Sequence, residues 1–154
     1  MANTYCSVTV HLVFAVKNRE ALIPAHELNR FHAYLGGVIR KIDERCVPLA
    51  VGGTPNHVHV LLTLPPKRSI SEIVKTIKLA GSRLVNEVLV IPFKFEWQRG
   101  YAAFAVSPSV VPSVCNYIAR QMEHHHSMTL REEIIRMFNA SGTEFDEKYI
   151  FDEV

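Results

Sequence analysis

The stretch PNHVHVLL, residues 55 to 62, has the apolar pattern of a buried β-strand, yet it carries two histidines. Side chains alternate along a strand, so His57 and His59 project from one face and the apolar residues beside them project from the other. The strand rise sets the roots of the two imidazoles about 7 Å apart, close enough for both rings to lean toward one metal ion. The alternative is that both are hydrogen-bonded structural histidines. Two nitrogen ligands rarely complete a metal site, so a further ligand would have to come from elsewhere.

Hydrophobic spacing and turn residues predict a regular succession of elements around this strand. In chain order they are a strand over 5–16, a helix over 26–45, a strand over 47–51, the histidine strand, a helix over 69–88 and a strand over 93–106. The first strand is expected to be half-buried, with His11 on its polar face. The first helix is weakened by Gly36 and Gly37, and the second opens with the capping box of Ser69 and Glu72.

This order is the split βαβ order of a ferredoxin-like sandwich, an α+β fold with an antiparallel sheet and helices on one face. The second face of the sheet is expected to be uncovered, where a ligand or a partner subunit could lie. One domain is predicted over residues 1–154, with the sandwich core at about 5–106 and an added C-terminal catalytic helix at about 108–126. The tail, 127–154, is predicted to be helical over 128–138 and ends in an acidic segment.

Composition fits a globular chain, since 48% of the 154 residues are hydrophobic and 21% are charged. No apolar run approaches the roughly 20 residues of a membrane-spanning helix, and the start lacks a secretion signal, so we expect a cytoplasmic protein with no membrane contact. Three distant cysteines with no CxxC pair argue against a disulfide framework or a zinc knuckle and predict reduced, mostly buried thiols. Residues 1–142 hold 16 basic and 10 acidic side chains, which is compatible with nucleic-acid binding without demanding it.

A second group of polar residues lies in NYIARQMEHHH, residues 116 to 126. Tyr117 and Gln121 are four residues apart and therefore share one helix face. The amide of Gln121 offers a carbonyl oxygen to a hard cation, Mg²⁺ or Mn²⁺. The phenol of Tyr117 becomes a nucleophile once it loses its proton, although its ordinary pKa of about 10 means that it needs help. The alternative is that both are ordinary surface and boundary residues.

Taken together, HVHV and the later YIxxQ pattern resemble the single-tyrosine HUH transposases of small bacterial insertion sequences. Further segments resemble that family in the same order, over about residues 5 to 151: HLVFAVKNR, KLAGSRLVNE, WQRGYAAFAVS, the histidines after YIARQ and the closing KYIFDEV. Each motif alone is weak evidence for the family, and the resemblance depends on all of them occurring in the same order. Where the family often has Asn before the glutamine, this chain has Arg120, which puts the local DNA contact in doubt.

The resemblance implies a specific chemistry. His57, His59 and Gln121 would hold a divalent metal ion, Mg²⁺ or Mn²⁺, at the scissile phosphate of single-stranded DNA. Tyr117 would attack that phosphate and leave a 5′-phosphotyrosine bond and a free 3′-hydroxyl. The resemblance also implies a homodimer that acts on the hairpin ends of an element.

Other polar residues carry weaker expectations. Lys75, Lys78, Arg83 and Arg120 are predicted to contact DNA phosphates, against the alternative of a solvated surface. Three aromatic residues either stack on unpaired bases or belong to the core or a dimer interface; they are Trp97, Tyr101 and Phe104. His11 is expected to be a structural histidine or a neighbour of the metal ligands. The consecutive histidines His124, His125 and His126 cannot all face one ion.

Two rival functions remain open from the sequence. An HUH nickase, or a host-adopted relative, would share the chemistry and differ in its substrate. A non-catalytic module that binds single-stranded nucleic acid would need neither Tyr117 nor the metal.

Overall fold

The chain folds around a four-stranded antiparallel sheet in the order β2-β3-β1-β4. The structure, a computed structural model, describes residues 3–18, 21–122 and 128–151. The strands are β1 (Thr9–Ala15), β2 (Pro48–Thr54), β3 (His57–Thr63) and β4 (Ala102–Val106). The helices are α1 (Leu28–Ile42), α2 (Ile70–Arg83), α3 (Val111–Ala119) and α5 (Leu130–Ser141). The strand-helix-strand-strand-helix-strand order and the strand arrangement confirm the predicted ferredoxin-like sandwich.

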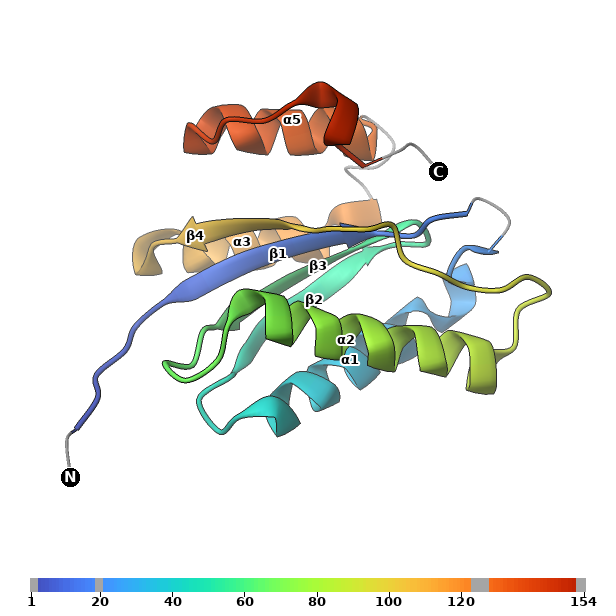
Figure 1. The fold of residues 1–154 in the computed structure, drawn as a ribbon, viewed down its shortest axis with the longest axis horizontal. Helices are drawn as coiled ribbons and strands as arrows, with labels where there is room; N and C mark the ends of the chain where they lie inside the picture. The colour runs from blue at the N-terminus through green and yellow to red at the C-terminus, as the bar shows by residue number, and fades with distance from the viewer. Residues whose placement is uncertain (1–2, 19–20, 123–127, 152–154) are drawn as a thin grey trace.

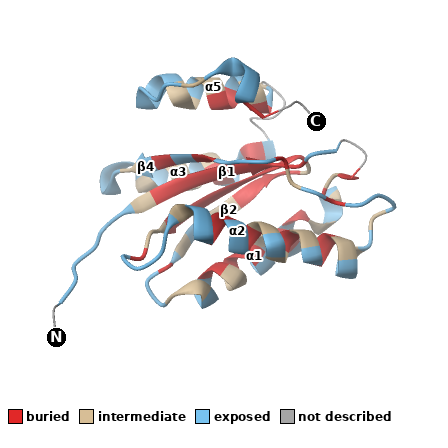
Figure 2. Ribbon diagram, viewed as in Figure 1, coloured by how far each residue is buried: buried red, intermediate tan, exposed pale blue. Residues whose placement is uncertain are grey.

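Helices α1 and α2 lie side by side against one face of the sheet (Figure 1). Val10, Leu12 and Phe14 of β1 point toward them, as does Val16 directly after the strand. These side chains meet fully buried residues of both helices, among them Phe31 and Ile77. Burial of large apolar side chains, each worth about 1.5–3 kcal/mol, makes this the main hydrophobic core. In Figure 2 it appears as the red inner surfaces between the sheet and the two helices.

The opposite face of the sheet is covered, so the predicted uncovered face is wrong. Helix α5 lies across this face (Figure 1) and packs Leu130 and Ile134 onto Val13 of β1 and Phe104 of β4. Helix α3 covers β2 and the beginning of β3. Strand β1 is therefore buried on both faces and not half-buried, because residues far along the chain supply a second layer.

The ends of several elements differ from the predicted ones. Ser69 caps α2 as expected, with its hydroxyl accepting the N–H of Glu72. The predicted strand over 93–106 is regular only in β4, preceded by a bridge between Trp97 and Val16. The predicted helix over 108–126 begins with a 3₁₀ turn, Pro108–Val110, before α3. Proline at the start of a helix favours such a tight first turn.

The three cysteines are unbridged, as expected. Cys46 is buried and Cys115 is half-buried, but Cys6 is exposed, so the prediction of mostly buried thiols holds only in part. None of the helices in the described part of the chain is long and apolar enough to cross a membrane.

Candidate active site

Strand β3 brings His57 and His59 to the sheet face that α3 and α5 cover. In the sheet register His57 lies between Ala15 and Thr54, and His59 lies between Val13 and Gly52. Both imidazoles are fully buried, and their ring centroids are 5.0 Å apart. The predicted placement of the two rings on one face is therefore confirmed.

The β2–β3 turn fixes the orientation of His57. The hydroxyl of Thr54 donates to Oδ1 of Asn56 at 2.7 Å, so its oxygen is left to accept. His57 Nδ1 lies 2.6 Å from Asn56 Oδ1 and 3.0 Å from Thr54 Oγ1. Because both neighbours act as acceptors toward it, Nδ1 carries the proton. The other nitrogen, Nε2, is thereby aimed away from the turn and toward α3 and α5.

His11 of β1 orients His59 in the same way. Nε2 of His11 lies 2.7 Å from Nδ1 of His59, with both rings buried. Burial, and then the neighbouring His59, lower the pKa of His11 to about 3, so His11 is neutral near pH 7. The two rings share one hydrogen bond, whose direction depends on the tautomers. In the tautomer in which His59 Nδ1–H donates to His11 Nε2, His59 Nε2 keeps the lone pair that a metal ligand needs.

Helix α3 approaches the sheet closely enough to put its polar face over the histidines. A Cβ on Gly52 would lie 2.6 Å from the carbonyl oxygen of Ile118, so only glycine permits this contact. Tyr117, next to Ile118, has its ring 5.7 Å from that of His59. Gln121, two residues beyond the end of α3, holds Oε1 2.8 Å from His57 Nε2. Both predicted residues thus reach the histidine pair within a single chain.

Helix α5 adds a residue that the sequence reasoning missed, the buried Glu133. The hydroxyl of Tyr117 donates to its Oε1 atom, and Nε2 of Gln121 donates to the same oxygen at 3.0 Å. Its carboxylate oxygens lie 3.2 Å from His59 Nε2 and 3.7 Å from His57 Nε2. Burial raises the pKa of Glu133, and the nearby His57 opposes that rise.

The donor set fits a divalent cation. Ligand atoms of His57, His59 and Glu133 all lie within 4.8 Å of one another, and Gln121 Oε1 lies beside them. Divalent cations such as Mg²⁺, Mn²⁺ and Zn²⁺ accept imidazole nitrogens and carboxylate or amide oxygens as ligands. The His-His-Glu group could therefore bind a metal ion next to the phenol of Tyr117.

A signal for Glu133 was present in the sequence. Leu130, Ile134 and Met137 form the apolar stripe of α5, and Glu133 stands within that stripe. A carboxylate on the buried side of an amphipathic helix requires a polar partner. The sequence did not reveal the partner, because the sheet face that α5 covers was expected to be open.

The predicted DNA-contacting residues are divided between the two sides of the sheet. Lys75 and Arg83 are exposed on α2, and Arg120 is exposed at the end of α3. Lys78 is half-buried, and its ammonium donates to the carbonyl oxygens of Gln98 at 3.0 Å and Gly100 at 2.7 Å. Contact of these four residues with DNA stays a prediction, and Lys78 already has partners within the chain.

The three aromatic residues have different surroundings. Trp97 packs edge-on against Phe14 and Phe95, and its indole N–H donates to the carbonyl of Lys78 at 2.8 Å. Phe104 is buried under α5. Tyr101 is 38% exposed. Trp97 and Phe104 are thus core residues, and Tyr101 alone of the three keeps an open ring face. The expectation for His124–His126 lies outside the described residues.

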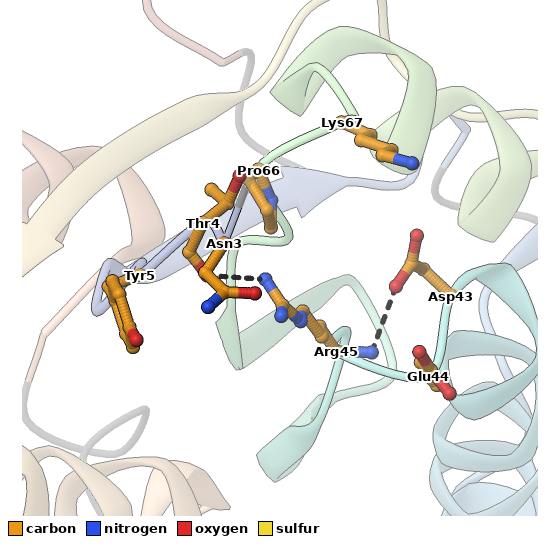
Figure 3. Close-up of a pocket in the computed structure, with 8 residues that line it drawn as sticks. All are labelled: Asn3, Thr4, Tyr5, Asp43, Glu44, Arg45, Pro66 and Lys67. Carbon is orange, nitrogen blue, oxygen red and sulfur yellow. Dashed lines mark hydrogen bonds between the residues drawn. The ribbon is translucent and has the colours of Figure 1, made fainter. Parts of the chain in front are cut away.

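A wide pocket of about 720 Å³ lies at the far end of the sheet from His57 (Figure 3). Its basic side chains Arg45 and Lys67 are balanced by Asp43 and Glu44. Arg45 also donates to the carbonyl of Thr4 at 3.2 Å. The end of β3 at Thr63 is six residues from His57 and four from His59, about 20 Å and about 13 Å at the strand rise. Neither its charge nor its position links it to the Tyr117 site.

Comparison with known proteins identifies a family. The family described as IS200-like transposases matches residues 4–121, which include both histidines, Tyr117 and Gln121 but not Glu133. The transposases of insertion sequence element IS200 from Salmonella typhimurium and Salmonella typhi are each 28% identical over 130 residues. Those alignments cover 80% of this chain and 82% of each relative.

Two solved structures share the fold. A candidate transposase from Deinococcus radiodurans aligns with a TM-score of 0.58 and 23% identity, over 79% of this chain and 96% of the other. A REP-associated tyrosine transposase bound to a REP hairpin aligns with a TM-score of 0.56 and 16% identity, over 99% of this chain and 90% of the other. Because the family match spans well over half of the sequence, the chain belongs to the IS200-like transposases, the tyrosine HUH transposases that the sequence motifs resemble.

Proposed function

We propose that this transposase cuts and rejoins single-stranded DNA through a covalent 5′-phosphotyrosine bond on Tyr117. One observation carries the proposal: side chains of β3, α5 and the α3 region converge, so that the phenol meets a cluster of metal-ligating atoms. A module that only binds DNA would have no need of a buried carboxylate bonded to a tyrosine beside two oriented histidines.

In the proposed site, His57, His59 and Gln121 hold Mg²⁺ or Mn²⁺, with Glu133 as a further oxygen ligand. The bound ion would polarise the scissile phosphate and stabilise charge on its oxygens. Asn56 and His11 keep Nε2 of the two histidines directed at the ion, since each accepts the Nδ1–H of its neighbour.

Glu133 is the proposed proton acceptor for Tyr117, because its Oε1 atom accepts the hydrogen bond of the phenol. As the proton passes to the carboxylate, the phenol oxygen bonds to phosphorus and the bond from phosphorus to the 3′-oxygen breaks. The 3′-oxygen leaves and takes up a proton, which yields a free hydroxyl. In rejoining, a 3′-hydroxyl attacks the phosphotyrosine, and Glu133 returns the proton to the departing phenol. The phosphotyrosine conserves the bond energy, so no external energy source is needed.

Hairpin ends of a mobile element are the proposed substrate. The fold relative bound to a REP hairpin supports this choice, as do the IS200 transposases among the sequence relatives. Action as a homodimer in the cytoplasm stays part of the proposal. Within one chain the ring of Tyr117 lies 5.7 Å from that of His59, which supports a site built from the residues of one subunit.

The test is an adduct assay. Single-stranded DNA from the ends of the element, labelled at either side of the cut, is incubated with the protein and Mg²⁺ or Mn²⁺ and then denatured. We expect the label on the 5′-phosphate side to stay with the protein, and we expect a chelator or Tyr117→Phe to abolish the adduct. Equal adduct in wild type and Tyr117→Phe, or DNA binding with no adduct under any metal, would overturn the proposal.

A further inference from the structure

A second pocket, of about 250 Å³, lies between the start of β4, α5 and the segment that follows α5. Five of its eleven lining residues are aromatic: Tyr101, Phe138, Phe145, Tyr149 and Phe151. The volume is below the roughly 300–1,000 Å³ of pockets that take drug-sized ligands. A pocket of this size and lining suits one flat ring system.

The pocket is next to the Tyr117 site on the same face of the sheet. Ile134 of α5 lines it, and the neighbouring residue, Glu133, belongs to the site. Phe138 follows Glu133 by five residues, about 7 Å along the helix axis. A stacked DNA strand covers that distance in about two nucleotides, at about 3.4 Å each. A strand whose phosphate lies at Tyr117 can therefore present a nearby base to the pocket.

Both sides of the pocket are held in place. The ammonium group of Lys78 donates to the carbonyl oxygens of Gln98 and Gly100 and so fixes the loop before Tyr101. The backbone N–H of Gln98 donates to the carbonyl oxygen of Ala15 at 2.8 Å. On the other side, Arg131 of α5 donates to the carbonyl of Glu147 at 2.8 Å. A pocket whose walls are already fixed loses little conformational entropy when a ligand binds.

The remaining wall residues suit a nucleobase. Tyr101 is 38% exposed and Tyr149 is 84% exposed, so both rings are accessible for stacking. Arg99 and Asp146 line the same pocket and offer hydrogen-bond donors and acceptors. Aromatic faces bind bases of any sequence, and charged groups at the edge add a preference among them.

We propose that this aromatic pocket holds one unpaired base of the DNA strand, within a few nucleotides of the bond that Tyr117 attacks. The inference rests on the proposed function and adds a base-binding subsite to it. Tyr101 and Tyr149 stack on the base, and Arg99 and Asp146 contact its polar edge.

The experiment places a single abasic site at each position around the cut in turn and measures the rate of adduct formation. Wild type is compared with Tyr101→Leu and Tyr149→Leu. Tyr5→Leu is the matched control, because Tyr5 is 91% exposed and lines the distant pocket of Figure 3. In wild type and Tyr5→Leu we expect one position at which loss of the base slows the reaction about tenfold. In the two pocket variants the intact DNA should react about tenfold more slowly, and loss of that base should have no further effect.

Two results would overturn the inference while leaving the proposed function intact. In one, every variant forms the adduct and keeps the wild-type dependence on the abasic position. In the other, Tyr101→Leu changes the molecular mass of the assembly but leaves the effect of the abasic site as in wild type. That result would mean that the pocket binds a partner subunit and not a base. Absence of any adduct in wild type would instead refute the proposed function itself, and the base-binding role with it.

Discussion

Glu133 is a buried carboxylate with polar partners on several sides. Tyr117 and Gln121 donate to it, and the ring nitrogens of His57 and His59 lie within ion-pair distance. An isolated buried charge is costly, and a buried carboxylate is tolerated when several donors surround it. Because these partners are also the candidate catalytic groups, the residue that holds the phenol in place is suited to receive its proton.

We predict that Glu133→Gln slows adduct formation by about 10²- to 10⁴-fold, the usual contribution of a positioned general base. The amide retains much of the packing but does not accept the phenol proton. Single-turnover rates with labelled DNA provide the measurement. Glu132→Gln is the matched control, since Glu132 is exposed and glutamine also serves at this position of the Thr129 capping box. A Glu133→Gln rate equal to that of Glu132→Gln would refute the role of Glu133.

His11 gives a second prediction at this scale. His11→Ala removes the acceptor that orients His59, so Mn²⁺ affinity should fall by about 10- to 100-fold, as is usual when such a partner of a metal ligand is lost. Titration with Mn²⁺ measures the effect directly. His26→Ala, at a histidine whose side chain is 83% exposed, should leave the affinity unchanged. Unchanged affinity in His11→Ala as well would show that the buried hydrogen bond does not orient the ligand.

The sequence predicts some of these residues for a physical reason. His57 and His59 follow from strand alternation, and Tyr117 and Gln121 follow from helical spacing together with the family resemblance. Glu133 and the bond between His11 and His59 depend on which elements pack together. Such contacts between distant elements cannot be read from local sequence patterns. The only local sign of them was the carboxylate of Glu133 on the apolar face of its helix.

Among the elements, the distance between α3 and the sheet sets how close Tyr117 lies to the two histidines. Gly52 pairs with His59 in the sheet and lies beneath Ile118 of α3. The absence of a side chain at this point lets the helix backbone approach the strand. Any larger residue would lift α3, and Tyr117 and Gln121 would move away from the histidines with it.

We therefore predict that Gly52→Ala reduces adduct formation at least tenfold, because displacements of about 1 Å at a reacting centre cost about that much or more. Circular dichroism should still show the native secondary structure. Gly37→Ala is the control: nothing lies within 4 Å of the added Cβ, and alanine favours a helix. A Gly52→Ala protein as active as Gly37→Ala would mean that this close contact is unimportant for the site.

The helices on the second sheet face show where element prediction fails. The apolar stripe of α5 was visible as a helix over 128–138, but nothing in its spacing states what it covers. Packing of Ile134 against Val13 makes β1 a strand buried on both faces. The alternation in β1 could not reveal this, because His11 and Thr9 gave its second face a polar appearance.

At the scale of the whole molecule, the two layers of helices leave several histidines with little water contact. His32 of α1 lies beside Phe31, and burial lowers its pKa to about 4. Among the described residues, its Nε2 atom has no hydrogen-bond partner. The folded protein therefore favours neutral His32, whereas the unfolded chain protonates it near the ordinary value of 6.5.

This difference predicts a pH-dependent stability. Between pH 6.5 and 4 the unfolded chain binds a proton at His32 that the folded chain does not, so the free energy of unfolding falls as the pH falls through this window. Urea unfolding at several pH values measures the slope. His32→Gln should flatten it, by on the order of 1–3 kcal/mol across the window, whereas exposed His26→Gln should not. Identical slopes in both variants and wild type would refute the prediction.

The ferredoxin-like topology as a whole was predictable, because the order of strands and helices admits few arrangements. The strand order follows from that sequence of elements, and the order found is the one expected. The covering of both faces was not predictable, because it depends on which sheet face α3 and α5 pack against, and no local pattern encodes that choice.

The central claim is that His57 and His59 direct their Nε2 atoms at a single cation beside Tyr117. Anomalous scattering from crystals grown with Mn²⁺ tests it most directly. We expect one peak, at a coordination distance of about 2.0–2.2 Å from both Nε2 atoms and next to Gln121 and Glu133. No peak between the two histidines, or a peak ligated by other residues, would contradict it.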